Sequence, residues 1–324
     1  MTTPALLTAE GLSVSFVQAR GLHRSGRIQA VRDVELAIRE GEVLALVGES
    51  GSGKTTLGRA LLRLIEADSG RICFGGTEIS GLSARSLRPL RRQMQMVFQD
   101  PFASLDPRMT VGAIVAEGLN VHGIGDGASR LARVSELLSL VGLDSSHAGQ
   151  RMRIASGGQR QRVGIARALA VNPRFIVADE PVSSLDVSVQ AQIITLLMNL
   201  KSELGLTLLF ITHNLGVVRL IADRVAVMYL GRIIELADSE VLFNTPRHPY
   251  TRILLDSVPR PDPRVKTVFA IQPGEPPSPA APPSGCAYRS RCVHALAGCA
   301  AQVPPLDAVS AHHRVACLRT QEIQ

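Results

Sequence analysis

The chain has 324 residues, of which 45% are apolar and 19% charged, and this balance excludes an intrinsically disordered protein. At roughly 150 residues per domain, the length predicts about two domains with a sizeable core. The net charge of +7 would suit an acidic partner, but only 3% of the residues are aromatic and tryptophan is absent, so a surface for stacking nucleic-acid bases is not expected.

From residue 1 to about 245, apolar runs alternate with segments of helical periodicity, which is typical of an α/β domain. The apolar runs predict strands at Val43–Val47, Arg71–Phe74, Gln95–Gln99, Phe175–Asp179, Leu208–Thr212 and Val225–Leu230. Helical periodicity predicts helices at Lys54–Ile65, Ser129–Leu140, Gln159–Ala170, Ser188–Leu204 and Leu215–Ala222. Residues 101–157 have no strand-like run, so we predict a helical insert there.

The composition changes after Tyr250. Repeated prolines between Pro259 and Pro283 disfavour helices and sheet ladders and predict a stiff linker or an extended arm. A tail with four cysteines follows this segment. We therefore predict a first domain over residues 1–245 and a small cysteine-containing extension over residues 246–324.

A phosphate-binding pattern follows the first predicted strand. Gly48–Thr55 reads GESGSGKT and fits G-x-x-x-x-G-K-[ST] between a strand and a helix. In such a loop, glycines let backbone N–H groups point at phosphate oxygens, and the helix N-terminus adds partial positive charge. Lys54, one of only three lysines in an arginine-rich chain, would contact the β- and γ-phosphates, and the Thr55 hydroxyl would bind Mg²⁺.

A carboxylate pair ends the predicted strand Phe175–Asp179. Open α/β sheets bind ligands at the carboxyl ends of their strands, so Asp179 would bind Mg²⁺, and Glu180 would orient or deprotonate the attacking water. A helix N-cap is the alternative interpretation of such a pair. The phosphate loop about 125 residues upstream favours the catalytic role.

Ala155–Gln159 reads ASGGQ and opens a predicted amphipathic helix between these two motifs. In this order, the three motifs resemble those of the ABC-type ATPases, with ASGGQ at the place of the signature motif. Ala155 departs from the leucine or phenylalanine usual in the family. Further matching positions are Phe16, Gln99, Ser184–Asp186 and His213.

The resemblance implies a P-loop NTPase fold with a mostly parallel sheet, and a head-to-tail dimer that holds two ATP molecules between its subunits. Phe16 would stack on adenine, although a core phenylalanine is the alternative. Glu180, His213 and Gln99 would be the catalytic residues. Mg²⁺ would be bound by Thr55, Gln99 and Asp179. The remaining ATP contacts would come from Gly48, Glu49, Ser50, Gly51, Ser52, Gly53, Lys54, Thr55 and Thr56, and, across the dimer, from Ser156, Gly157, Gly158, Gln159 and Asp186.

Further segments resemble the ATP-binding subunits of dipeptide, oligopeptide and nickel importers, in particular the second of their two ATPase subunits. These segments are Gly48–Leu64, Phe98–Val111, Arg247–Arg252, Gly274–Pro279 and Gly285–Cys292. The implied function is ATP hydrolysis that powers peptide uptake through a permease. The alternatives are the same motor for nickel or another small solute, and a soluble ABC ATPase that acts on nucleic acid or ribosomes.

The implied partners are a related ATPase subunit or a second copy of this chain, two transmembrane permease subunits and, indirectly, an external solute-binding protein; nucleic acid is not among them. The sequence contains no run of 18 apolar residues and no secretion signal, so we expect a peripheral protein on the cytoplasmic face of the cell membrane.

The cysteines of the tail are Cys286, Cys292, Cys299 and Cys317. In a reducing compartment such a group favours a metal site over disulfides. Four thiolates can bind a [4Fe–4S] cluster, and similar tails in the importer family are associated with one. A zinc site that includes a nearby histidine, and no metal at all, are the alternatives.

Overall fold

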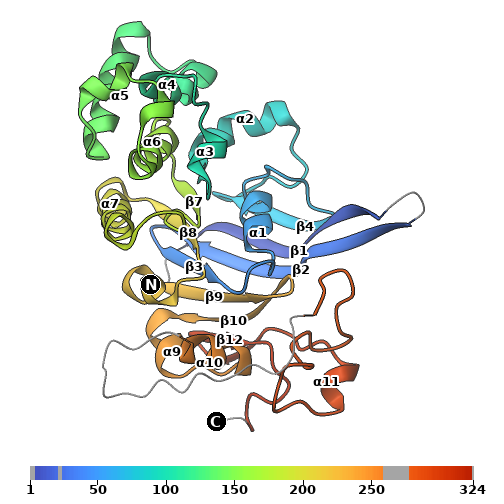
Figure 1. The fold of residues 1–324 in the computed structure, drawn as a ribbon. Helices are drawn as coiled ribbons and strands as arrows, with labels where there is room; N and C mark the ends of the chain where they lie inside the picture. The colour runs from blue at the N-terminus through green and yellow to red at the C-terminus, as the bar shows by residue number, and fades with distance from the viewer. Residues whose placement is uncertain (1–3, 21–23, 258–276, 323–324) are drawn as a thin grey trace, which may run out of the picture. The chain divides into compact units, whose positions relative to one another are not determined.

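The computed structural model describes residues 4–20, 24–257 and 277–322 (Figure 1). These residues fall into two compact units. The first unit takes its described residues from within Met1–Leu6, Arg39–Glu42 and Gly81–Ile211, and the second from within Leu7–Ile38, Val43–Ser80 and Thr212–Gln324. The domain boundary predicted at residue 245 is a different division and stays a prediction.

The first unit contains three parallel strands in the order β8–β7–β6. Strands β7 (Phe175–Asp179) and β8 (Thr207–Ile211) are buried along their whole length, as expected for parallel strands covered on both faces. β6 is Met94–Val97. The predicted bounds of β7 are confirmed, and β8 is shifted by one residue. β6 ends two residues earlier than predicted, which leaves Gln99 in the loop after it.

Residues 101–157, all of which the structure describes, form the predicted helical insert and contain no strand. The insert contains α3 (Pro101–Ser104), α4 (Val111–His122), α5 (Gly127–Leu140) and the 3₁₀ turns Ser145–Gly149 and Met152–Ile154, and α6 (Gly157–Leu169) begins at its end. Side-chain oxygens of Thr110 and Asp126 accept N–H groups at the starts of α4 and α5. The unit also contains α2 (Ala84–Gln93), which the sequence analysis missed, and α7 (Val187–Leu204).

The second unit contains an antiparallel sheet in the order β2–β1–β4–β5. β1 (Ala5–Arg20) and β2 (Arg24–Arg39) were not predicted; β4 (Ser69–Phe74) begins two residues before the prediction, and β5 is Thr77–Glu78. Five further strands lie in the order β11–β12–β10–β9–β3.

Within these five strands, β3 (Val43–Val47), which has the predicted bounds, is parallel to β9 (Arg224–Tyr229). The remaining pairs are antiparallel: β10 (Arg232–Asp238) with β9, β12 (His313–Val315) with β10, and β11 (Asp307–Ser310) with β12. The predicted α/β fold with parallel strands is confirmed, with added antiparallel strands that the sequence analysis did not predict.

The helices of the second unit are short. They are α1 (Lys54–Leu61), α8 (Leu215–Ile221), α9 (Ser239–Asn244), α10 (Pro249–Asp256) and α11 (Gly298–Ala301). The prediction that α1 continues to Ile65 is wrong, because Arg63 has a left-handed φ of 53°, which ends the helix.

Segments far apart in the sequence share the core of the second unit. Tyr229 from the end of β9, Tyr250 from α10 and Tyr288 from the cysteine segment are all buried in one apolar cluster. Most of the predicted linker, residues 258–276, lies outside the described residues. Among the residues that the structure describes, no helix has the length and apolar character required to cross a bilayer.

Candidate functional site

The backbone of the phosphate loop requires glycine at two positions where the chain passes close to a neighbour. At Gly48, an added Cβ would lie 2.2 Å from the carbonyl oxygen of Met228, and at Gly53 it would lie 2.1 Å from that of Ala30. Gly53 also has a φ of +103° and stands immediately before α1. The loop therefore turns tightly from β3 into α1, as the sequence motif predicts.

Lys54 is 5% exposed, and its ammonium group lies within the loop. Nζ donates to the carbonyl oxygens of Gly48 and Glu49 at 2.8 Å each and lies 3.4 Å from the Ser52 hydroxyl. No side chain caps the N-terminus of α1, so its first N–H groups face the loop with their partial positive charge. This combination of one fixed cation and helix N–H groups is suited to phosphate.

The catalytic carboxylate predicted from the sequence lies in the first unit, beside the predicted glutamine. Asp179 is the buried last residue of β7, and Glu180 follows it. The Gln99 amide donates to the Glu180 carboxylate at 3.1 Å, although 81 residues separate the two in sequence. Glu180 has a φ of +42°, a strained conformation for a non-glycine residue and one that is common at functional sites.

The alternative interpretation of this acidic pair as a helix N-cap is wrong. The next helix, α7, begins seven residues after Glu180 and is capped by Asp186, whose carboxylate accepts the Val189 N–H at 3.0 Å and the Ser188 hydroxyl at 2.7 Å. These hydrogen bonds lower the pKa of Asp186, the Ser188 hydroxyl contributing most. Asp186 thus stabilises the start of α7, and a nucleotide contact from it stays a prediction.

The signature segment forms the N-terminus of α6 in the first unit. Ser156 and Gln159 form a reciprocal capping box, with hydrogen bonds of 2.9 and 3.3 Å. At Gly158, an added Cβ would lie 2.9 Å from a Val189 methyl group, so the glycine allows α6 to begin close to α7. Ser156 is exposed at this helix end, together with partly buried Gly157.

The other candidate residues belong to the second unit. Phe16, on β1, is 46% exposed, so the alternative of a core phenylalanine is wrong. His213 is exposed and directly precedes Asn214, the N-cap of α8. Thr55 and Thr56 are partly buried in the first turn of α1.

Two residues to which the sequence analysis gave no role contact the phosphate loop. The Tyr250 hydroxyl accepts the main-chain N–H of Glu49 at 2.9 Å. The Arg291 guanidinium lies 3.1 Å from both oxygens of the Glu49 carboxylate. Because 201 and 242 residues separate these partners, no local pattern in the sequence could have indicated the contacts.

The three tyrosines behind these contacts pack against one another. The Tyr229 ring centroid lies 4.7 Å from that of Tyr250 and 5.3 Å from that of Tyr288, and 5.4 Å separates the latter two. Burial raises the pKa of Tyr288 to about 12 and raises the pKa values of Tyr229 and Tyr250 as well. All three hydroxyl groups are therefore neutral at physiological pH.

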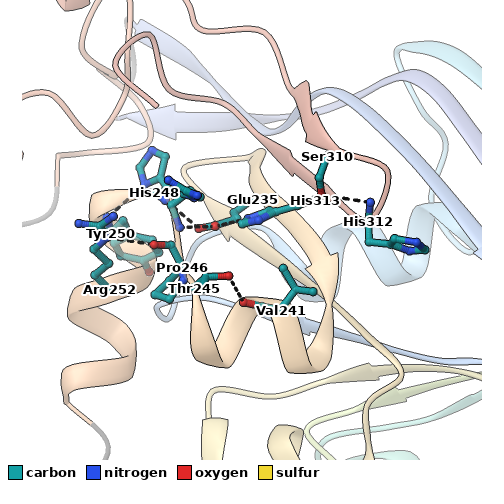
Figure 2. A network of polar contacts seen from close by, with 11 residues as sticks. Glu235, Val241, Thr245, Pro246, His248, Tyr250, Arg252, Ser310, His312 and His313 are labelled. Carbon is teal, nitrogen blue, oxygen red and sulfur yellow. Dashed lines mark hydrogen bonds and ion pairs between the residues drawn. The ribbon is translucent and has the colours of Figure 1, made fainter. Parts of the chain in front are cut away.

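A buried carboxylate attaches the C-terminal strands and α10 to β10 (Figure 2). Glu235 accepts the main-chain N–H groups of Arg247 and His248 at 2.7 and 3.0 Å, and the His313 imidazole lies 2.7 Å from it. Burial raises the pKa of Glu235, but hydrogen bonds from His313, Thr251 and Arg247 outweigh this effect and leave it below the usual value. Glu235 therefore stays ionised in the core.

His248 caps α10 beside this carboxylate. Its Nδ1 accepts the Tyr250 N–H at 3.1 Å, which requires a neutral ring at that nitrogen. Burial lowers the pKa of His248 to about 4, against an opposing effect of the Glu235 charge. The helix that presents Tyr250 to the phosphate loop thus begins on an uncharged histidine.

The four cysteines of the tail are partly buried and line one small cavity. Burial raises the pKa of Cys286 to about 11, and raises the pKa values of Cys292 and Cys317. In the part of the chain that the structure describes, no three histidine, cysteine or acidic side chains converge as ligands of a metal ion. The described side chains, as placed, thus form neither a zinc site nor an iron–sulfur site, although the four thiols share this cavity.

A phosphate loop after a buried strand and a carboxylate pair after a parallel strand define a P-loop ATPase. Residues 31–183 match the family profile described as ABC transporter, and residues 234–299 match that of the oligopeptide/dipeptide transporter, C-terminal region. The chain belongs to the ATP-binding subunits of the ABC transporter family, with ATP and Mg²⁺ as the general requirements of that family.

Several relatives extend the match over nearly the whole chain. A putative peptide import ATP-binding protein of Brucella ovis is 53% identical over 319 residues, 98% of this chain and 99% of that protein. The oligopeptide transport ATP-binding protein AppF of Bacillus subtilis is 50% identical over 90% of each chain. Among solved structures, the dimeric ATP-binding cassette MJ0796 bound to ADP and phosphate is 30% identical, with a TM-score of 0.65 over 72% of this chain and 98% of that one.

Proposed function

We propose that this chain is the ATP-hydrolysing subunit of an importer that takes up peptides. The observation that supports this most is the 53% identity to a peptide import ATP-binding protein over 98% of the chain. The match includes the C-terminal region, whose family profile is described by oligopeptide and dipeptide transport. Nickel or another small solute is an alternative cargo for the same motor.

In this proposal, the second unit binds the nucleotide. Lys54 and the N–H groups of Gly48–Thr56 bind the phosphates, since the loop already fixes its cation and its helix N-terminus at one place. Phe16, with its exposed ring, stacks on adenine. His213 stabilises charge on the γ-phosphate.

The first unit supplies the groups that act on water. Glu180 orients or deprotonates the attacking water, and Gln99, which is hydrogen-bonded to it, links this carboxylate to the helical insert that begins at Pro101. The oxygens of Thr55, Gln99 and Asp179 are donors of the kind that Mg²⁺ prefers. Mg²⁺ held by them would neutralise phosphate charge.

Hydrolysis would take place in a head-to-tail dimer, formed with a related subunit or with a second copy of this chain. The dimeric cassette MJ0796 supports the first part of this proposal. The exposed Ser156 and the segment Gly157–Gln159 would contact the nucleotide of the facing subunit, with Asp186 along the seam. ATP closes such a dimer, and hydrolysis lets it open.

Two permease subunits would convert this motion into uptake. The helical insert would contact them, and an external solute-binding protein would deliver the solute to them. The chain would thus be peripheral to the cytoplasmic face of the membrane.

We also propose that the four cysteines bind a [4Fe–4S] cluster. What supports the proposal is that all four thiols line one small cavity and that four thiolates can bind such a cluster. The buried Tyr288 hydroxyl, which has no hydrogen-bond partner among the residues that the structure describes, also lines this cavity and is a potential donor to such a group. The cluster would attach a segment that has little core of its own.

The test is peptide uptake by the importer assembled with its permease. We expect Glu180→Gln to abolish ATP turnover and uptake of a labelled peptide while binding MgATP as the wild type does. Competition by unlabelled peptides but not by Ni²⁺ would support peptides as cargo, and the reverse pattern would refute them. Wild-type turnover in the Glu180→Gln variant would remove this carboxylate from the mechanism.

A further inference from the structure

Two residues that follow position 245 in the sequence form polar contacts with the phosphate loop. Both holding contacts converge on Glu49, the second residue of the loop. The Tyr250 hydroxyl accepts its N–H, and the Arg291 guanidinium pairs with its carboxylate. One loop residue is thus fixed at its main chain and at its side chain by two different segments of the second unit.

Glu49 also contacts the predicted phosphate-binding cation, the Lys54 ammonium group. The carbonyl oxygen of Glu49 accepts a hydrogen bond from Lys54 Nζ at 2.8 Å. Direct contacts therefore run from Arg291 to the Glu49 side chain, and from the Glu49 main chain to Lys54. A rotation of Glu49 would move the acceptor that holds the lysine ammonium.

Arg291 is itself rigidly placed. Its side chain is 6% exposed, against 28% for Glu49, and it lies 3.5 Å from the Tyr229 hydroxyl. Its N–H donates to the carbonyl oxygen of Tyr288, a member of the tyrosine cluster. A buried guanidinium with a fixed backbone loses little freedom when it pairs, so the contact is stronger than that of an exposed ion pair.

Charge gives the contact a second effect. A carboxylate in a phosphate-binding loop repels the triphosphate that the loop must accept. The Arg291 guanidinium compensates this charge and holds the carboxylate in a defined position. Without Arg291, a half-buried Glu49 would be left unpaired beside the nucleotide.

We propose that Arg291 is a positioning residue for nucleotide binding, which acts through Glu49 on Lys54 and makes the affinity for MgATP depend on the folded cysteine segment. The inference rests on the proposed function, because it assumes that the loop binds ATP. It adds a residue of the C-terminal extension to the nucleotide site of the cassette. Arg291 does not contact the nucleotide in this proposal.

A double-mutant cycle on the full chain tests it. We expect Arg291→Gln to weaken MgATP binding about tenfold in a calorimetric titration, with kcat at saturating ATP within about twofold of wild type, since a buried charged hydrogen bond is lost and no reacting group changes. In a Glu49→Gln background, the same substitution is expected to change affinity less than about twofold, because its partner charge is gone. Arg314→Gln is the matched control: Arg314 belongs to the same extension and pairs with Glu35 of β2 at 3.3 Å, and its loss is expected to leave affinity unchanged.

The results separate the inference from the function on which it rests. Equal losses of affinity in both backgrounds would mean that Arg291 only supports the fold, and unchanged affinity in Arg291→Gln would also overturn the inference. If wild-type protein binds no MgATP, the proposed function fails together with the inference. If Arg291→Gln cannot be purified, Arg291→Lys replaces it in the cycle. This variant keeps the charge but does not place its donor where Arg291 Nη1 contacts both Glu49 oxygens, so we expect about threefold weaker binding in the Glu49 background and unchanged binding in the Glu49→Gln background.

Discussion

We expect the second unit to lose stability between pH 7 and pH 5 because of His248. The folded protein holds this imidazole neutral, with a pKa of about 4, whereas the unfolded chain binds a proton at its ordinary value of 6.5. Unfolding therefore takes up a proton in this window, and stability falls as the pH falls. The two pKa values correspond to a loss of about 2 kcal/mol between pH 7 and pH 5. Glu235 does not contribute here, because its lowered pKa removes stability only below its unfolded value of 4.5.

Urea unfolding at the two pH values measures this loss. The three tyrosines of the chain all lie in the buried cluster, and tryptophan is absent, so intrinsic fluorescence reports on this core. His248→Asn keeps a side-chain oxygen that can cap α10 and removes the titrating group. Between pH 7 and pH 5, the free energy of unfolding of this variant is therefore expected to fall about 2 kcal/mol less than that of wild type. His147→Asn, in the other unit, is the control and keeps the wild-type dependence. If His248→Asn lost as much stability as wild type, the assigned cause would be wrong.

Three further predictions concern stability and the cysteine tail. Gly53→Ala is expected to lower the free energy of unfolding in urea by more than about 2 kcal/mol, because its Cβ would overlap the Ala30 carbonyl oxygen. Gly51→Ala, which has open space and a φ of +78°, is expected to lower it only by the backbone strain of about 1–2 kcal/mol, and equal losses in the two variants would contradict the overlap. Glu235→Gln is expected to lower the free energy of unfolding by about 3 kcal/mol in the same assay, because an amide N–H would face main-chain N–H donors. The control Glu78→Gln, at an exposed residue, is expected to change it little, and similar values for both would refute a stabilising role of the buried Glu235 carboxylate. Protein purified without oxygen is expected to be brown and to contain iron, and Cys292→Ser to lose both; a colourless, iron-free wild type would reject the cluster.

Local patterns predicted the elements that lie nearest the chemistry. The strands Val43–Val47 and Phe175–Asp179 have the predicted bounds, since each is a continuous apolar run that ends at a motif. The phosphate loop was identified from its own motif, Glu180 from its place after an apolar strand, and Gln99 separately, from the family resemblance. Spacing alone could not have shown that Gln99 bonds Glu180, which depends on β6 being the neighbour of β7.

The missed elements depend on distant partners. β10 contains Glu235, and a charge inside a buried strand does not fit the apolar pattern from which strands were predicted. Its compensation comes from His313, and that of Glu49 from Arg291, far along the chain. The sharp turn between β9 and β10 uses Leu230 with a φ of 43°, a conformation that propensity would not assign to leucine.

The pairing of Glu235 with His313 has a consequence for how the protein is made. The histidine follows the carboxylate by 78 residues, and at about 5–20 residues per second a ribosome needs about 4–16 s to add them. During that interval the nascent β10 holds an acid that can accept the N–H groups of Arg247 and His248 but still lacks its imidazole partner. A molecule released before position 313 would keep its ATP-binding motifs but lack the side-chain partner of this buried acid, so its lower stability would expose it to proteolysis as an incomplete product.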